Sequence, residues 1–219
     1  MRVSGRTIKR KITKAKSNPF SSRFIQPGAI EYEFFGRCDI ESLAGRFLDL
    51  RSRRGMIVGP HGSGKSTLVE SLMKRIQVND PDVSIVQQRL TRERGSKRCQ
   101  RVLSHQWKRE SIIVLDGFEQ VSLWSQLRIH TAVLRKRIRL LVTVHKPIRM
   151  FDLLWQTKTD DHAAEWLVQR LLGLSDQPEF EIQLQSLLSS EAWSLSRSRH
   201  GQNIRETLFD MYDWWRDNH

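Results

Sequence analysis

A glycine-rich segment with one lysine and several hydroxyl side chains carries the clearest chemistry in the sequence. Residues 59 to 66 follow the pattern Gly-x-x-x-x-Gly-Lys-Ser. Glycines let the backbone turn its N–H groups toward phosphate oxygens, and the positive end of a following helix adds to the attraction. In this pattern Lys65 contacts the β- and γ-phosphates and Ser66 holds Mg²⁺. The expected nucleotide-binding residues of the segment are Gly59, Pro60, His61, Gly62, Ser63, Gly64, Lys65, Ser66 and Thr67.

The flanking residues supply the strand and the helix that this pattern needs. The short apolar run 56 to 58 before the loop is typical of a buried strand. After the loop, Leu68, Leu72 and Ile76 recur at helical spacing. This order distinguishes a phosphate-binding loop from a glycine-rich turn that binds nothing, which is the alternative interpretation. We therefore expect a nucleoside triphosphate at the loop.

Two acidic residues downstream are candidates for the rest of a hydrolytic site. Asp116 follows four apolar residues and fits the acidic element that holds Mg²⁺ through water. Glu119 lies in the loop that leaves this predicted strand, within reach of a water attacking the terminal phosphate, so it is the candidate general base. The alternatives are an ordinary turn residue for Asp116 and an acid favoured by a helix N-terminus for Glu119.

Thr143 and His145 end the next predicted strand, where they would present polar groups to the terminal phosphate or to the water. Strand packing is the alternative for Thr143, because threonine is common in strands. For His145 the alternative is a surface histidine. We expect no metal site at His145, because no second histidine lies at ligand spacing.

The elements that position these residues alternate between strand and helix. Apolar patterns predict helices over 39–50, 122–137 and 161–174, and strands over 56–58, 83–90, 111–115 and 139–145. Such alternation indicates a parallel sheet flanked by helices, with ligands beyond the carboxyl ends of its strands. Phe180, Ile182 and Leu184 alternate as a further short strand, and two helices follow, capped by Ser189 or Ser190 and by Asn203.

Basic residues are concentrated in the first two thirds of the chain. The net charge is +13; residues 1–149 carry 31 basic and 12 acidic side chains, and residues 150–219 carry 6 and 12. No acid precedes Glu31, so the first segment is predicted to be a disordered basic arm. Such an arm could neutralise phosphates of nucleic acid or an anionic surface. The alternatives are a solubilising tail, counter-charge for the acidic C-terminal third, or an organelle presequence.

The composition excludes several classes of protein. No apolar run approaches the roughly 18 to 20 residues that span a bilayer, and the first residues lack the apolar segment of a secretory signal. The two cysteines, Cys38 and Cys99, are too few for a disulfide framework and wrongly spaced for zinc. We expect a cytoplasmic protein without a membrane span.

With these residues in place, the chain resembles the AAA+ and STAND ATPases, in the branch near the origin-recognition ATPases and bacterial AAA-type regulators. The resemblance covers roughly residues 34 to 216. Residues 35–41, Phe-Gly-Arg-Cys-Asp-Ile-Glu, are similar to the family's Gly-Arg box that precedes the phosphate loop and packs near the adenine. This similarity implies that Arg37 contributes to nucleotide binding.

Three later segments carry the same resemblance. Residues 112–119, Ile-Ile-Val-Leu-Asp-Gly-Phe-Glu, are similar to the STAND form of Walker B, and Thr143 ends a segment in the sensor 1 place. His200 to Arg205 is similar to the sensor 2 segment, whose arginine reaches the γ-phosphate from a lid. A surface arginine is the alternative for Arg205. Gly117 follows Asp116 where the common AAA+ pattern has Glu, which argues against rapid hydrolysis.

These features together predict an α/β P-loop NTPase of AAA+-like form, with about five strands and a short helical lid. Its expected parts are an arm and lead-in over 1–30, a core over 31–184 and the lid over 185–219. The chain would bind ATP and hydrolyse it to switch a conformation or an assembly with itself or another protein. Expected catalytic residues are Lys65, Glu119, Thr143 and Arg205, and expected Mg²⁺ ligands are Ser66 and Asp116.

Two other functions are alternatives to this ATPase hypothesis. One is an ATP-dependent binding or scaffold protein with negligible hydrolysis, and the other is a small-molecule kinase. The Asn-Lys-x-Asp motif that GTPases use for guanine is absent from the sequence, which favours ATP. Arg135 and Arg137 are candidates for an arginine finger by position alone, with a solvated helix face as the alternative.

Overall fold

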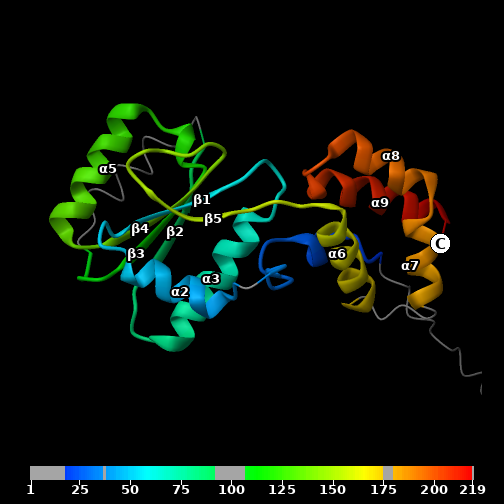
Figure 1. Ribbon diagram of the computed structural model, residues 1–219, viewed down its shortest axis with the longest axis horizontal. Coiled ribbons are helices and arrows are strands. Elements are labelled where there is room, and N and C mark those ends of the chain that lie inside the picture. Colours follow the sequence, from blue (N-terminus) through cyan, green and yellow to red (C-terminus); the bar gives the residue numbers. More distant parts are fainter. Residues whose placement is uncertain (1–17, 37, 92–106, 175–179, 219) are drawn as a thin grey trace, which may run out of the picture.

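A computed structural model describes residues 18–36, 38–91, 107–174 and 180–218 of the chain (Figure 1). The predictions made for the basic arm, up to residue 17, and for Arg37 concern residues outside these ranges, and they stay predictions. Within the ranges described, no helix combines the length and the apolar character needed to cross a membrane.

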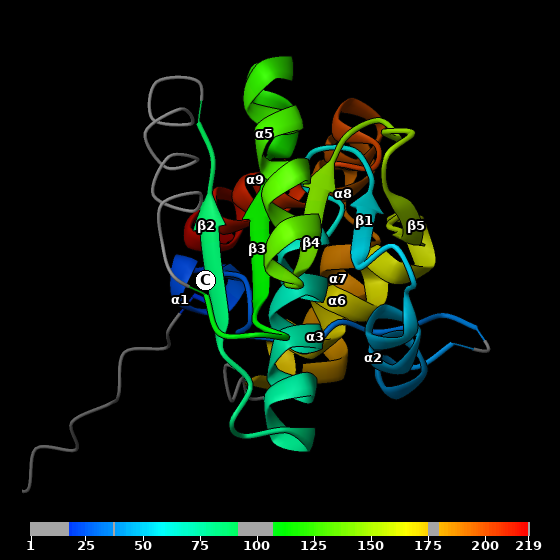
Figure 2. The same ribbon diagram turned by 90° about the vertical axis from the view of Figure 1, so that its left-hand side faces the viewer.

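Five parallel strands form one sheet in the order β2-β3-β4-β1-β5, seen side by side in Figure 2. The strands are β1 (Arg54–Val58), β2 (Ile85–Arg89), β3 (Ile112–Asp116), β4 (Arg139–Val144) and β5 (Asp152–Gln156). Asp116 pairs in register with Thr143, and Val58 pairs with Val144. The residues that leave β1, β3 and β4 therefore meet at one edge of the sheet, and the predicted parallel sheet is confirmed.

Helices cover both faces of the sheet (Figure 1). The helices α2 (Ile40–Asp49) and α3 (Lys65–Asn79) pack on one face, and α5 (Leu123–Lys136) packs on the other. Successive strand residues point to opposite faces. Accordingly Ile112 and Val114 join the core with α2 and α3, whereas Ile113 and Leu115 join the core with α5. Burial on both faces explains the continuous apolar run over residues 112–115 of β3.

A helical unit lies beside the sheet and contains α6 (Asp161–Leu174), α7 (Phe180–Leu188), α8 (Glu191–His200) and α9 (Ile204–Asn218). Its apolar side chains form a separate core, which also takes in Phe20 and Ile30 from the segment that carries α1 (Ser22–Ile25). The Phe20 ring meets Trp215 edge to face, with centroids 5.9 Å apart. Residues 18–30 are thus packed onto the helices.

The predicted boundary at residues 184/185 falls inside α7, and α6 belongs to the same core as α7 to α9. We therefore propose that the α/β unit ends near Thr157 and that the lid begins at Asp161.

The strand predicted around 180–184 is wrong, because these residues lie in α7. Gln183 and Leu187, four residues apart on one face of the helix, are buried, while Ile182 is 66% exposed. Burial therefore follows the helical period and not the two-residue alternation of residues 180, 182 and 184. The fifth strand is β5, which the sequence did not indicate. Its residues are mostly exposed or half-buried, since it is an edge strand, and it therefore lacks an apolar run.

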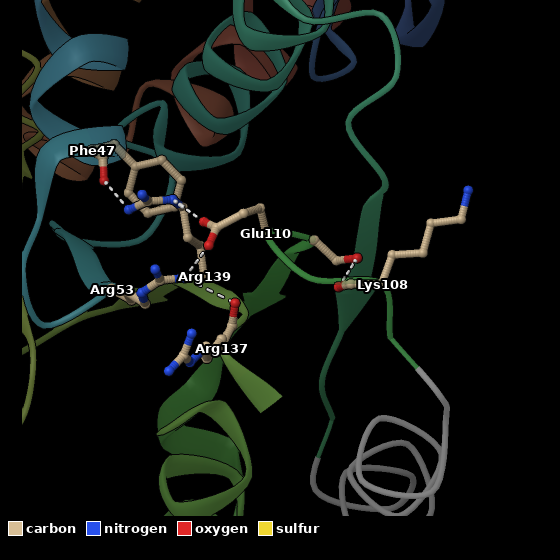
Figure 3. A network of polar contacts seen from close by, with 7 residues as sticks. Phe47, Arg53, Lys108, Glu110, Arg137 and Arg139 are labelled. Carbon is tan, nitrogen blue, oxygen red and sulfur yellow. Dashed lines mark hydrogen bonds and ion pairs between the residues drawn. The ribbon is translucent and has the colours of Figure 1, made fainter. Parts of the chain in front are cut away.

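A polar network ties together the turns that precede β1, β3 and β4 (Figure 3). Arg53, Glu110 and Arg137 have left-handed backbone conformations, with φ of 59°, 62° and 52°. Arg53 Nη1 donates to Glu110 Oε1 at 2.6 Å and to the Arg137 carbonyl at 2.9 Å, and the other Glu110 oxygen pairs with Arg139 at 3.5 Å. The network lies at the amino ends of the strands, opposite the glycine-rich loop.

Candidate nucleotide site

A cavity of about 410 Å³ lies between the carboxyl ends of the strands and the helices α6 and α9. Of the predicted site residues, those that line it are His61, Gly62, Ser63, Gly64, Lys65, Ser66, Thr67, Asp116, Glu119, Thr143, His145 and Arg205. Gly59 and Pro60 lie behind this lining and contact it through their carbonyl groups. The opposite wall is apolar and is formed by residues such as Phe24, Ile30, Trp166, Leu171 and Leu208.

The glycine-rich loop joins β1 to α3. The first turn of α3 follows Gly64, and its leading N–H groups lack carbonyl partners within the helix, as at any helix start. Gly62 has a φ of 68°, and a Cβ at this position would overlap the side chain of Asn203. Since Asn203 immediately precedes α9, the loop and the lid touch at a position where a side chain does not fit.

The Lys65 ammonium is folded back on its own loop. Its Nζ donates to the carbonyl oxygens of Gly59 at 2.7 Å and of Pro60 at 2.6 Å. Burial lowers the pKa of Lys65; the carboxylates of Glu119 and Asp116 oppose this shift, and the positive charge of Arg205 adds to it. The lysine therefore stands among two acids and an arginine that come from three other elements.

Asp116 is held by two hydroxyl groups. Ser66 Oγ donates to Asp116 Oδ2 at 3.4 Å, and Thr143 Oγ1 donates to Asp116 Oδ1. The Thr143 hydroxyl also accepts a hydrogen bond from the Gly117 N–H at 3.0 Å. A carboxylate beside a serine hydroxyl is a donor set of hard oxygens, which suits Mg²⁺. The structure gives Thr143 a contact with Asp116 that orients this carboxylate.

Glu119 reaches the cavity through a tight turn. Gly117 has a φ of 77° and leads into a 3₁₀ turn, Phe118–Gln120, anchored by the fully buried Phe118. A glutamate at position 117 would be strained in this left-handed conformation. Glu119 Oε1 lies 2.7 Å from His145 Nδ1. Its Oε2 atom is buried and has no hydrogen-bond partner among the residues described.

Thr157 is a structural support of the loop that the sequence did not reveal. It follows β5, is fully buried, and its N–H donates to the Val58 carbonyl at 2.8 Å. Its hydroxyl shares a hydrogen bond with Ser63 Oγ at 2.6 Å, and a Cβ at Gly59 would overlap it. No pattern could have indicated Thr157, because the strand that precedes it was not predicted.

Comparisons with known proteins give matches at the level of structure alone. No known family's sequence pattern matches the chain, and no curated protein matches it. C. elegans PCH-2 matches with a TM-score of 0.51 and 13% identity, over 82% of this chain and 68% of PCH-2. The Aeropyrum pernix ORC1 protein, solved in complex with DNA, matches with a TM-score of 0.53 and 10% identity, over 84% and 62% of the two chains. A DNA replication initiation factor matches with a TM-score of 0.50 and 12% identity, over 82% and 62%.

The chain has the AAA+ ATPase fold. It spans 62 to 68% of the length of these three structures. In this AAA+ fold the cavity lies beyond the carboxyl ends of parallel strands, where ligands of such sheets bind. The predicted fold class is confirmed, and identities of 10 to 13% carry the likeness no further than the fold.

Proposed function

We propose that the protein binds ATP with Mg²⁺ and hydrolyses it to ADP and phosphate. The observation that carries the proposal is the meeting of Lys65, Asp116 and Glu119 in one cavity, from three separate elements. Two acidic side chains beside a half-buried lysine, together with a carboxylate oxygen that lacks a partner among the described residues, are typical of a site built for a polar ligand.

Each residue has a role in this proposal. Lys65 exchanges its bonds to the loop carbonyls for bonds to the β- and γ-phosphates. Ser66 and Asp116 would hold Mg²⁺, which when bound neutralises charge on the phosphate oxygens. Glu119 accepts a proton from the attacking water on Oε2. Arg205, from the lid, brings a second positive charge to the terminal phosphate.

We propose that the purine ring of the nucleotide lies against the apolar wall of the cavity. Purine rings stack on or pack against apolar and aromatic side chains, and residues of this kind from the lead-in and from α6 and α9 face the loop across the cavity. The sequence lacks the guanine motif of GTPases, so we propose adenine.

A second candidate is a nucleotide-dependent binding protein with negligible hydrolysis. The feature that favours it is Gly117, which stands directly after the proposed metal ligand where the common pattern has the catalytic acid. In this case the basic arm, or a contact with another protein or a second copy, would carry the function. Binding of duplex DNA that is salt-dependent and lost on deletion of residues 1–17 would support a role for the arm.

Equilibrium binding and turnover separate the two candidates. We expect Lys65→Ala to weaken binding of fluorescent Mg²⁺-ATP and to abolish phosphate release. Lys74→Ala, on the exposed side of the same helix, is the matched control and leaves both unchanged. ATP binding without phosphate release by the wild-type protein would select the second candidate, and absence of ATP binding would refute both.

A further inference from the structure

We infer that His145 is the positioning residue of Glu119: its ring fixes one carboxylate oxygen and leaves the other to accept the proton of the attacking water. The contact that carries this inference is the 2.7 Å approach of His145 Nδ1 to Glu119 Oε1. The Oε2 atom is buried and unpaired among the described residues, so the carboxylate keeps one oxygen without a hydrogen-bond partner there. The inference rests on the proposed hydrolysis.

The backbone holds His145 beside the loop. It directly follows β4, and the carbonyl of its neighbour Val144 accepts a hydrogen bond from the Gly59 N–H at 3.1 Å. The side chains of His145 and Glu119 are 27% and 29% exposed, so both are largely shielded from water. A shielded hydrogen bond of this length restricts the carboxylate more than an exposed one does.

The His61 ring restricts His145 from a second direction. The two ring centroids are 3.9 Å apart, with the planes tilted by 43°. His61 belongs to the glycine-rich loop, so the imidazole of His145 is held between the phosphate-binding element and the candidate base. This arrangement links the position of Glu119 to the loop that would hold the phosphates.

Burial, more than the charges around it, favours a neutral His145 ring. Burial lowers the pKa of His145, Lys65 from α3 and His61 from the loop lower it further, and Glu119 from the 3₁₀ turn raises it. The ring is therefore neutral above its ordinary pKa of about 6.5 and remains so somewhat below it. A neutral Nδ1–H donates to Glu119 without transferring a proton, whereas a protonated ring binds the carboxylate as an ion pair and makes it a weaker proton acceptor.

The proposed step keeps the proton on Glu119. The water oxygen bonds to the γ-phosphorus, the bond from phosphorus to the bridging oxygen breaks, and its electron pair leaves with ADP. The O–H bond of the water breaks, and its proton passes to Glu119 Oε2. His145 neither gains nor loses a proton, so its contribution is orientation.

Two substitutions separate orientation from bulk packing. His145→Ala removes the hydrogen bond, and we expect kcat to fall by about 10- to 100-fold, as misplacement of a catalytic group does, with the affinity for ATP unchanged. His145→Asn keeps an amide N–H that can reach Glu119 but does not titrate. We expect it to recover kcat to within about threefold of the wild type at pH 8. It should also lack the acid-side fall that the wild type shows below the pKa of His145. His130→Asn, at the other end of the sheet, is the control and keeps the wild-type pH profile.

An NMR titration tests the same contact without turnover. The His145 ring signal is assigned by its loss in His145→Asn, and its pKa is measured without nucleotide in the wild type and in Glu119→Gln. We expect the pKa to fall in Glu119→Gln, because the carboxylate is the group that raises it. An unchanged titration would refute the contact.

The outcomes distinguish this inference from the proposed function. If the wild type hydrolyses ATP and His145→Ala does so at the same rate, the inference is refuted and the proposed hydrolysis is retained. Equal losses in His145→Ala and His145→Asn also overturn it, because a hydrogen bond would then not be the cause. A wild-type protein that binds ATP without turnover overturns the hydrolysis, and the role of His145 with it.

Discussion

Gly62→Ala tests whether the lid is seated on the phosphate loop. At a φ of 68° an alanine adopts a left-handed conformation, which costs about 1 to 2 kcal/mol. The new Cβ would overlap the Asn203 amide and lie 3.2 Å from the Asn203 Cα, so this side chain must leave its position. A displaced rotamer costs about 0.5 to 1.5 kcal/mol. The expected loss of unfolding free energy is therefore about 1.5 to 3.5 kcal/mol, the sum of the two terms.

Thermal unfolding of a double-mutant set measures the two terms separately. For a chain of this size the combined loss lowers Tm by about 3 to 14 °C. Asn203→Gly removes the overlapping amide and costs only a few tenths of a kcal/mol at a position that precedes a helix. The double variant Gly62→Ala/Asn203→Gly keeps the backbone term and loses the overlap, so it should be more stable than the sum of the single changes by about 1 kcal/mol.

Additivity of the two substitutions would refute this reasoning. If the double variant loses as much free energy as the two single variants together, within about 0.3 to 0.5 kcal/mol, then Gly62 and Asn203 do not touch. In that case the lid does not rest on the loop, and Arg205 would not be held near Lys65 by this contact.

Three further changes have defined outcomes. Arg137→Gly relieves a left-handed arginine whose carbonyl accepts the hydrogen bonds from Arg53 and Glu110, so Tm should rise by about 1 to 4 °C. Arg135→Gly, inside α5, should lower Tm by a similar amount. Thr157→Val removes the hydrogen bond to Ser63 and should cost about 1 to 3 kcal/mol in urea unfolding. Asp116→Asn should remove most of the gain in ATP affinity that Mg²⁺ gives, measured by titrating fluorescent ATP with and without the metal; an undiminished gain would exclude Asp116 as a ligand.

The inner strands were predictable because burial on both faces demands continuous apolar runs. The run from Ile112 to Leu115 and the strand at 139–144 follow this rule, and the structure places both in the middle of the sheet. The edge strand β5 escapes the rule, since Leu153 is 49% exposed and the strand mixes polar and apolar residues. In α7, Gln183 and Leu187 are buried by packing against the other helices. This tertiary packing outweighs the local alternation, which is typical of a strand.

The chemistry of the loop was predictable for a different reason. The motif is local in sequence, so its spacing alone identifies Lys65, Ser66 and the glycines. Asp116 is identified because it comes directly after an apolar strand. The contacts of Glu119 with His145, and of Ser63 with Thr157, join residues 26 and 94 positions apart in the chain. Such pairs depend on the register of neighbouring strands, which no local pattern encodes.

The most direct test of the proposed function is steady-state phosphate release from saturating Mg²⁺-ATP by the wild-type protein beside Glu119→Gln, with ATP affinity measured for both. The proposal predicts turnover by the wild type, a loss of about 100-fold or more in Glu119→Gln, and equal affinities. Equal turnover in the two proteins would contradict the assignment of the base. ATP binding without turnover in the wild type would contradict hydrolysis itself.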